Sequence, residues 1–232
     1  MKTIVAVALL SFSASTWQTA PIRADEVTLR REIYQDAHVK AFLLDIPPGQ
    51  ATVQHRHDHD ILTVFVTGGK TRAVFNGAAP VDDTFAVGDV RFRSSGFTHS
   101  TENRDSVDFL AVIFEFVESQ GERVPPTRSA THACAAGGQM ECVDEKPVLC
   151  TARICVDEIT MAPQAVKQDG PATMDRMLVA ISGYTLREQS EGAVASVHSR
   201  KTGEVELVSA GPARRWINTA STPAHYVVVT YR

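Results

Sequence analysis

After its first 24 residues, the sequence lacks any run of about 20 apolar residues, the length that a membrane-spanning helix needs. It also lacks a cluster of lysine and arginine. Its 27 acidic residues outnumber the 23 basic ones, so the formal net charge is −4. A protein that binds nucleic acid usually presents a basic face. We therefore expect no nucleic-acid partner, and no membrane contact once the N-terminal segment is removed.

Residues 1–24 have the pattern of a secretory signal peptide. Lys2 gives a positive start, a short apolar run covers positions 4–10, and Ala24 is a small residue at a cleavage position. Ala20 is an alternative cleavage position that the following proline disfavours, and an N-terminal strand or amphipathic extension is the alternative to a signal. Removal of the segment takes away two basic residues and changes the formal charge from −4 to −6. We expect a secreted or periplasmic protein.

Cysteine is scarce and concentrated. The four cysteines fall within 22 residues, and none of them forms the C-x2-C pair that is typical of zinc sites. An even number of cysteines in an exported chain indicates two local disulfides, whose three possible pairings remain open. A zinc site and free buried thiols are the alternatives. The cysteines are Cys134, Cys142, Cys150 and Cys155.

The sequence repeats itself at an offset of 115 residues. Residues 46–117 align with residues 161–232 without a gap, and 14 of the 72 pairs are identical, where about five are expected by chance. Recurring glycines indicate a shared pattern of turns, because glycine tolerates the positive φ that many turns need. The matched pairs include Gly68/Gly183, Gly77/Gly192, Gly88/Gly203, Gly96/Gly211, Asp60/Asp175 and Asn103/Asn218.

Short apolar stretches, separated by clusters of Gly, Asp, Asn and Ser, indicate many short strands, and neither copy shows a helical period. This pattern is typical of an all-β sandwich or barrel. The expected strands are 62–66, 72–75, 90–93 and 109–116 in the first copy, and 177–181, 205–208 and 225–231 in the second.

The repeat also divides the chain into domains. We predict an N-terminal barrel at residues 25–117 and a C-terminal barrel at residues 150–232. Residues 118–149 lie between them and contain paired prolines, paired glycines and two cysteines, with little apolar periodicity. This segment is predicted to be a linker in which disulfides substitute for a core.

The first copy contains two histidine motifs. In the first motif, Gly49 precedes His55 and His57, and Gly68 follows eleven residues after the second histidine. The second motif, at a distance in the sequence, contains Gly88, Gly96, His99 and Asn103.

These motifs resemble those of the cupin superfamily, which read G-x5-H-x-H-x3–4-E-x6-G and G-x5-P-x-G-x2-H-x3-N. The sequence departs from them twice, because Ser94 replaces the proline and Ile61 stands where the first motif has its glutamate. The resemblance covers residues 39–117. With the repeat, it implies two tandem cupin barrels (jelly-roll or double-stranded β-helix), a bicupin whose second copy is degenerate.

The histidines predict a metal site. Residues i and i+2 of a strand face the same way, so His55 and His57 point together, and the resemblance implies that His99 joins them inside the barrel. Neutral imidazole is a favoured ligand of transition metals. We predict one divalent metal per chain, with iron(II) expected first and manganese, nickel, copper or zinc as alternatives. Because three histidines leave its charge uncompensated, the ion should attract an anionic ligand to its open positions.

Two neighbouring residues are weaker candidates for a catalytic role. His59 continues the alternation and is a fourth ligand, a substrate contact or a loop residue. Asp60 recurs as Asp175 in the second copy, which has no ligand histidines, and this favours a structural turn.

The second copy carries Gly170, Ala172 and Arg214 at the positions of the three histidines. Arg214 and Arg187 could hold an anion, but surface arginines are the simpler interpretation. We therefore expect metal binding in the first copy only.

Within the superfamily, three-histidine sites are associated with iron-dependent dioxygenases of thiols and diketones. The resemblance thus implies a dioxygenase-type oxidoreductase that acts on a small anionic or enolisable substrate. One alternative is a non-catalytic cupin that binds a metal or a small ligand such as a sugar. Another is a metal-dependent isomerase, decarboxylase or lyase. The oligomeric state is expected to be a monomer or a homodimer.

Overall fold

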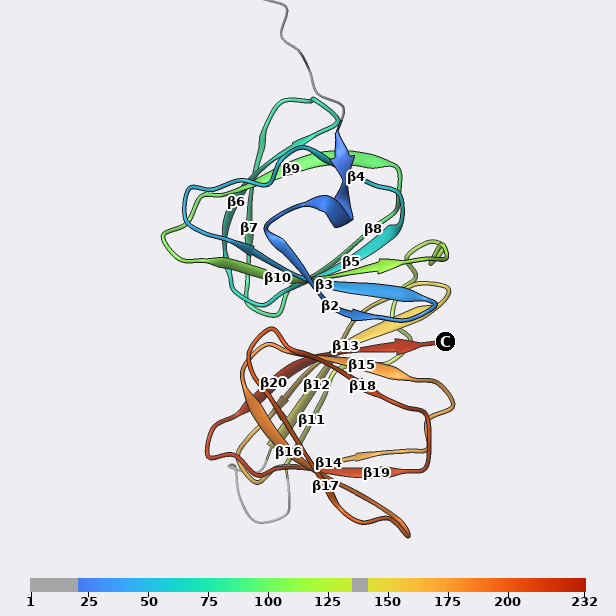
Figure 1. Ribbon diagram of the computed structural model, residues 1–232. Coiled ribbons are helices and arrows are strands. Elements are labelled where there is room, and N and C mark those ends of the chain that lie inside the picture. The colour runs from blue at the N-terminus through green and yellow to red at the C-terminus, as the bar shows by residue number, and fades with distance from the viewer. Residues whose placement is uncertain (1–20, 135–141) are drawn as a thin grey trace, which may run out of the picture.

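The computed structural model describes residues 21–134 and 142–232, which form two β-barrels, one above the other in Figure 1. The N-terminal barrel contains strands β1–β10 and a single 3-10 helix, η1, and the C-terminal barrel contains β11–β20. Each barrel consists of two sheets, and the described ranges contain no α-helix. The prediction of an all-β chain is confirmed, and the arrangement of the sheets fits the predicted pair of tandem barrels.

The N-terminal barrel has two five-stranded sheets, in the orders β1-β4-β9-β6-β7 and β2-β3-β10-β5-β8. Its elements are β1 (Ile22–Arg23), η1 (Ala24–Glu26), β2 (Arg30–Gln35), β3 (Val39–Ile46), β4 (His55–His57), β5 (Asp60–Phe65), β6 (Gly69–Phe75), β7 (Val81–Phe85), β8 (Val90–Arg93), β9 (Phe97–Asn103) and β10 (Phe109–Phe116).

The C-terminal barrel has sheets in the orders β11-β12-β13-β20-β15-β18 and β14-β19-β16-β17. The segment predicted as a linker supplies its first two strands, and β12 pairs with β13. Its elements are β11 (Thr131–Cys134), β12 (Cys142–Cys150), β13 (Ile154–Met161), β14 (Val166–Asp169), β15 (Arg176–Ala180), β16 (Tyr184–Ser190), β17 (Ser196–Arg200), β18 (Val205–Val208), β19 (Arg214–Asn218) and β20 (Ala224–Tyr231).

The 115-residue offset is visible in the structure. Strands β3, β6, β7, β8 and β10 recur as β13, β16, β17, β18 and β20 with bounds shifted by 115. Turn contacts recur as well. The backbone N–H of Ser95 donates to Asp60 at 2.8 Å, and the N–H of Ala210 donates to Asp175 at 2.7 Å. The repeated aspartate therefore holds the same turn in both barrels.

The two barrels pack through an apolar face that each presents from one sheet. Leu62 on β5 and Met177 on β15 are both fully buried there, and they occupy the same position of the repeat. Because equivalent positions of the repeat contribute to this one cluster from both barrels, the interface has the self-complementary character of a twofold contact. Seven pairs follow this rule, namely Val39/Ile154, Ala41/Val156, Leu62/Met177, Val64/Val179, Val66/Ile181, Val112/Val227 and Phe114/Val229.

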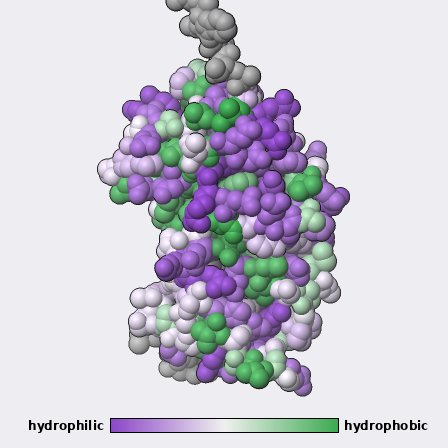
Figure 2. Space-filling view, in the orientation of Figure 1, coloured by the Kyte–Doolittle hydropathy of each residue, from purple (hydrophilic) through white to green (hydrophobic). Residues whose placement is uncertain are grey.

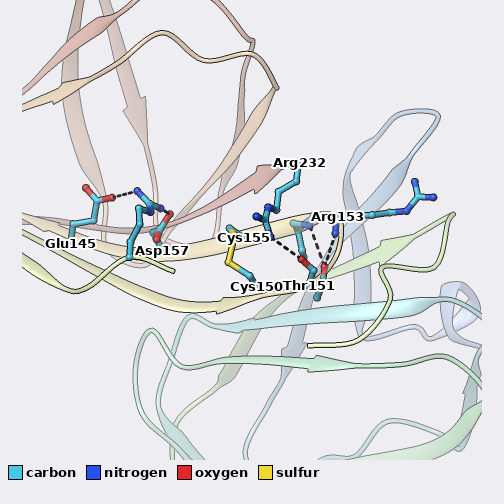
Figure 3. Close-up of a disulfide and its surroundings, with 9 residues drawn as sticks. Glu145, Cys150, Thr151, Arg153, Cys155, Asp157 and Arg232 are labelled. Atoms are coloured by element: carbon cyan, nitrogen blue, oxygen red, sulfur yellow. Dashed lines mark hydrogen bonds and ion pairs between the residues drawn. A yellow bond between two sulfur atoms is a disulfide. The ribbon is translucent and has the colours of Figure 1, made fainter. Parts of the chain in front are cut away.

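A disulfide between Cys150 and Cys155 joins β12 to β13 (Figure 3). The turn that it closes is fixed by Thr151, whose hydroxyl accepts the backbone N–H of Arg153 at 3.2 Å. Cys142 is also disulfide-bonded, and the described residues contain no free cysteine. The prediction of disulfides is confirmed there, and neither zinc nor free thiols accounts for these cysteines.

The N-terminal segment enters the fold earlier than the sequence predicted. Residues 1–20 of the predicted signal lie outside the described residues, but Ile22 in β1 pairs in parallel with His55 in β4. Ala24 is buried, and its carbonyl accepts an N–H of Arg30 at 2.7 Å. Positions 21–24 therefore belong to the barrel in this structure.

The surface is mostly hydrophilic on the face that Figure 2 shows, with apolar residues in separate patches. Among the described residues, no helix is long and apolar enough to cross a membrane.

A candidate metal centre in the N-terminal barrel

The three predicted ligands meet inside the N-terminal barrel. His55 and His57 are the two ends of the short strand β4, and both are buried because the alternation turns them inward. β4 pairs antiparallel with β9 so that His55 lies directly opposite His99. One ring nitrogen from each residue lies within 4.8 Å of the others. Within residues 21–134 and 142–232, this is the single group of three such side chains with metal-binding geometry.

In His55 and His99, the second ring nitrogen has a polar partner that orients the ring. Nδ1 of His55 donates to the carbonyl oxygen of Val53 at 2.8 Å. Nδ1 of His99 lies 3.4 Å from the hydroxyl of Thr101. This leaves the Nε2 atoms facing the centre, and those of His57 and His99 are 3.1 Å apart. Such outer contacts fix the tautomer of a ligating histidine.

A buried ion pair lies behind His57. Glu115 on β10 has Oε1 3.3 Å from Nδ1 of His57, although this contact lacks the alignment of a full hydrogen bond. The same oxygen accepts Nη2 of Arg30 at 2.8 Å, and both side chains of this pair are less than 10% exposed. The pair gives His57 a carboxylate neighbour whose charge the guanidinium balances.

Burial keeps the imidazoles neutral. It lowers the pKa of His55 to about 4 and, together with the neighbouring imidazoles, the pKa of His99 to about 2. Burial also lowers the pKa of His57. For Glu115, burial alone would raise the pKa, but contact with His57 and Arg30 outweighs it and lowers the pKa to about 2. At neutral pH the site therefore offers three neutral imidazoles backed by one carboxylate.

These residues fit a divalent transition metal. Two imidazole nitrogens bound to one ion at about 2.1 Å and at right angles lie about 3.0 Å apart. The observed separation of 3.1 Å between His57 and His99 agrees with that spacing. Neutral imidazoles with free Nε2 atoms are the donor chemistry that manganese, iron and similar ions accept.

A small apolar cavity opens beside the histidines. Its volume is about 110 Å³, and His57 and His99 lie in its wall. Five phenylalanines dominate the lining, and Phe65 and Phe85 stack at 3.8 Å between ring centroids. The aromatic residues are Phe65, Phe75, Phe85, Phe97 and Phe109, and the charged residues at the opening are Asp83, Arg91 and Arg93.

The structure separates the weaker candidates from this cavity. Asp60 is buried and accepts the backbone N–H groups of Ser95 and Gln120, so its carboxylate holds two loops together. His59 is exposed and does not line the cavity. Ile61 does line it, as the motif position predicts.

The equivalent region of the C-terminal barrel contains ion pairs in place of histidines. Arg176 takes the position of Ile61, and its Nη1 donates to Asp169 at 2.8 Å. Arg214, at the position of His99, is 10% exposed and pairs with Glu188 at 2.7 Å. Its interpretation as a surface arginine is therefore wrong. Charged side chains also line a cavity of about 460 Å³ in this barrel.

Sequence reasoning missed Arg30 and Glu115. A signal for Glu115 was present, because it is the single charge within the apolar strand 109–116 and shares its alternation with Phe109, Ala111 and Ile113. A charged residue on the inward face of a strand requires a partner. Arg30 had no comparable signal, since it lies among other charged residues near the N-terminus.

The sequence matches no protein-family model and none of the curated proteins. The fold has many counterparts. AerE from Microcystis aeruginosa aligns over 89% of this chain and 98% of its own, with a TM-score of 0.59 and 10% identity. Oxalate decarboxylase from Bacillus subtilis at pH 4.6 aligns over 83% of this chain and 68% of its own, with a TM-score of 0.58 and 12% identity.

A further structure of the Bacillus subtilis oxalate decarboxylase, from work on its Mn(II) centers, gives a TM-score of 0.57 at 11% identity, over 83% of this chain and 68% of that one. At sequence identities this low, the similarity is evidence for a shared fold only. The fold is thus that of cupin-type barrels, and a three-histidine group lies inside the first of them.

Proposed function

We propose that this protein is a divalent-metal-dependent enzyme that acts on a small carboxylic acid, by decarboxylation or a related lyase reaction. One observation carries the proposal. Three neutral imidazoles form one cluster, two of them line a small apolar cavity, and the described residues place no carboxylate in that cluster as a ligand. The charge of a bound ion is therefore left for an anionic substrate.

The cavity sets the size of that substrate. An apolar protein cavity of about 150 Å³ holds one benzene molecule, so 110 Å³ accommodates a molecule of about six non-hydrogen atoms or fewer. Small carboxylic acids fall within this range. The structural similarity to oxalate decarboxylase supports the same class of reaction.

A metal bound here would act as a Lewis acid toward a coordinated carboxylate. His55, His57 and His99 would hold it, while Glu115 would orient His57 from behind. The phenylalanine walls exclude water and strengthen charge interactions inside. Decarboxylation breaks the bond to the carboxyl carbon, releases CO₂ and takes up one proton. We propose manganese(II) first, because a structural neighbour has Mn(II) centers, and iron(II) second.

A dioxygenase remains the second candidate. The observation in its favour is the same ligand set, since three protein ligands leave positions for both a substrate and oxygen. The two reactions differ in stoichiometry, because decarboxylation consumes no net oxygen. We also propose that the protein is an exported bicupin, with one metal in its N-terminal barrel.

The test begins with protein loaded with Mn(II) or Fe(II) and mixed with small carboxylic acids, oxalate first. CO₂ release without matching oxygen uptake supports the decarboxylase, and stoichiometric oxygen uptake supports the dioxygenase. His99→Ala should abolish turnover and lower the metal content. His38→Ala, an exposed histidine outside the cavity, is the matched control. A metal-loaded protein that turns over no acid would contradict the enzyme proposal and favour a binding protein.

A further inference from the structure

We propose that Arg93 is the carboxylate-binding residue of this cavity, so that the site selects small molecules with two acidic or oxygen-donor groups. One group would face the histidines and the other, a carboxylate, would pair with Arg93. This inference rests on the proposed function and names its substrate class, which is small dicarboxylates and 2-oxo or 2-hydroxy acids.

The sheet register places Arg93 at the correct position. On β8 it lies directly opposite Ile61 of β5, and Ile61 in turn lies opposite Glu115 of β10. All three residues therefore lie in one row across the sheet. Arg93 and Ile61 both line the cavity, together with His57 and His99. The row places a cation on one side of Ile61 and the Arg30–Glu115 pair on the other.

Aromatic contacts hold the guanidinium at the opening. Its Cζ lies 4.3 Å from the ring centroid of Phe75 and 5.2 Å from that of Phe97. Stacking on a ring occupies the face of a guanidinium and leaves its N–H edge available. That edge matches the two oxygens of a carboxylate, which it binds through two parallel hydrogen bonds.

Arg93 differs from its neighbour in its partners. Arg91, two residues earlier on the same strand, is paired with Asp83 through two contacts, the shorter of 2.6 Å. Within the described residues, Arg93 forms no such ion pair. Asp83 and Arg91 are the charged groups that act on it. Two arginines and one aspartate thus leave the opening with one excess positive charge.

The charges also explain why a monofunctional acid would use the site poorly. Arg30 and Glu115 neutralise each other behind the histidines. A bound divalent ion and Arg93 would then be two separate positive sites in one cavity of about 110 Å³. A single carboxylate satisfies one of them and forgoes the charge-assisted contact with the other.

The test compares anion binding to Mn(II)-loaded protein. Oxalate represents acids with two functions, and formate and azide represent those with one. Dissociation constants come from calorimetry and from changes in the Mn(II) spectrum. Arg93→Gln should weaken oxalate binding by about 10- to 100-fold, the value of a charge-assisted contact. Azide binding and metal content should change by less than about threefold.

Two further variants sharpen the comparison. Arg93→Lys keeps the charge but loses the two-pronged edge, so its oxalate affinity should fall between wild type and Arg93→Gln. Arg72→Gln is the matched control, because Arg72 is a half-buried arginine paired with Asp82 at 2.7 Å, outside the cavity. It should bind oxalate as wild type does.

The outcomes separate this inference from the proposed function. If wild type binds oxalate and Arg93→Gln binds it equally well, Arg93 has no such role and the proposed function stands. If metal-loaded wild type binds azide but no small carboxylate, both proposals fail. A loss of oxalate and azide binding together in Arg93→Gln also overturns the inference, because the variant would then have disturbed the metal.

Discussion

Glu115 lies directly across the sheet from Ile61, so a carboxylate enters this site from the strand next to the one on which the motif would place it. Its Oε1 contacts Nδ1 of His57 rather than the side that faces the cavity. Because Arg30 balances this carboxylate, Glu115 acts on the site only through His57 and leaves the open positions of a metal free.

Glu115→Gln should therefore weaken metal binding. Removing the carboxylate behind a ligating histidine typically costs about 10- to 100-fold in affinity. The change also leaves Arg30 buried without its counter-charge, so thermal stability should fall as well. A chelator competition measures the affinity. Glu102→Gln, which alters a glutamate paired with Arg104 at 2.7 Å away from the cavity, is the control. Equal affinities in wild type and Glu115→Gln would remove Glu115 from the site.

Ile61→Glu should maintain or raise metal affinity and weaken the binding of anions to the metal. The new carboxylate would lie between Arg93 and Glu115 in the same row, where it can approach a metal and compensate its charge. Metal affinity should hold or rise, while azide and oxalate should bind more weakly. Spectroscopic titration of the Mn(II)-loaded variant measures both. Anion affinities that stay at the wild-type level would show that position 61 does not face the metal.

Gly88→Ala should loosen the contact between the barrels. Gly88 has φ +84°, and an added Cβ would lie 2.7 Å from the Glu158 carboxylate, which His225 holds at 2.9 Å. Gly77→Ala is the matched control, since Gly77 has φ +73° and no atom within 4 Å of an added Cβ. The control should cost about 1–2 kcal/mol for the left-handed backbone. Gly88→Ala should cost about 1 kcal/mol more by thermal unfolding, and equal costs would contradict a tight contact.

Asp169 should contribute stability that depends on pH. Burial alone would raise its pKa, but Lys167 and Arg176 outweigh burial and lower it. The stabilisation is therefore present above the unfolded value of about 3.9 and is lost as the pH falls toward the lower folded pKa. Asp169→Asn should cost on the order of 3 kcal/mol at pH 7.

Unfolding experiments from pH 7 to pH 3 check this expectation, and the gap between wild type and Asp169→Asn should narrow below about pH 4. Asp108→Asn, at an exposed position, should show no gap at any pH. A difference in stability between wild type and Asp169→Asn that stays constant down to pH 3 would contradict the claim that ionised Asp169 stabilises the fold.

The N-terminal strand β1 should support the metal centre. Because Ile22 pairs with His55 and the carbonyl of Ala24 accepts Arg30, a chain that starts at Asp25 loses support for β4. We expect its metal affinity to be about 10-fold below that of a chain that starts at Pro21. Chelator competition on the two purified chains measures this. If both bind metal equally, β1 does not support the site.

Much of the fold was predictable because it depends on periodicity and turn chemistry. The glycines at 77 and 192 have the same φ of +73°, as a shared turn pattern predicts. The i, i+2 spacing of His55 and His57 predicted that these two side chains point together, and the resemblance to the cupin motifs predicted that His99 joins them. The first signal is local in the sequence, whereas the second depended on comparison with a family pattern.

Contacts between distant strands were not predictable. The Arg30–Glu115 pair joins residues 85 positions apart, and its register follows from how β2, β3 and β10 align. The formation of strand β12 within the segment predicted as a linker also depends on pairing with another strand. Its apolar residues Val143 and Leu149 are buried only because β13 pairs beside them.

The apolar face between the barrels has a consequence for the history of the chain. A polypeptide with one such barrel would carry a self-complementary patch, and it would pair with its own copy as a twofold dimer. Joining two copies in one polypeptide makes that pairing permanent and independent of concentration. The two halves then no longer need identical interiors, because each half has its own stretch of sequence, which can change independently of the other. One half could keep its histidines while the other carries Gly170, Ala172 and Arg214 at those positions, without loss of the face that holds both together.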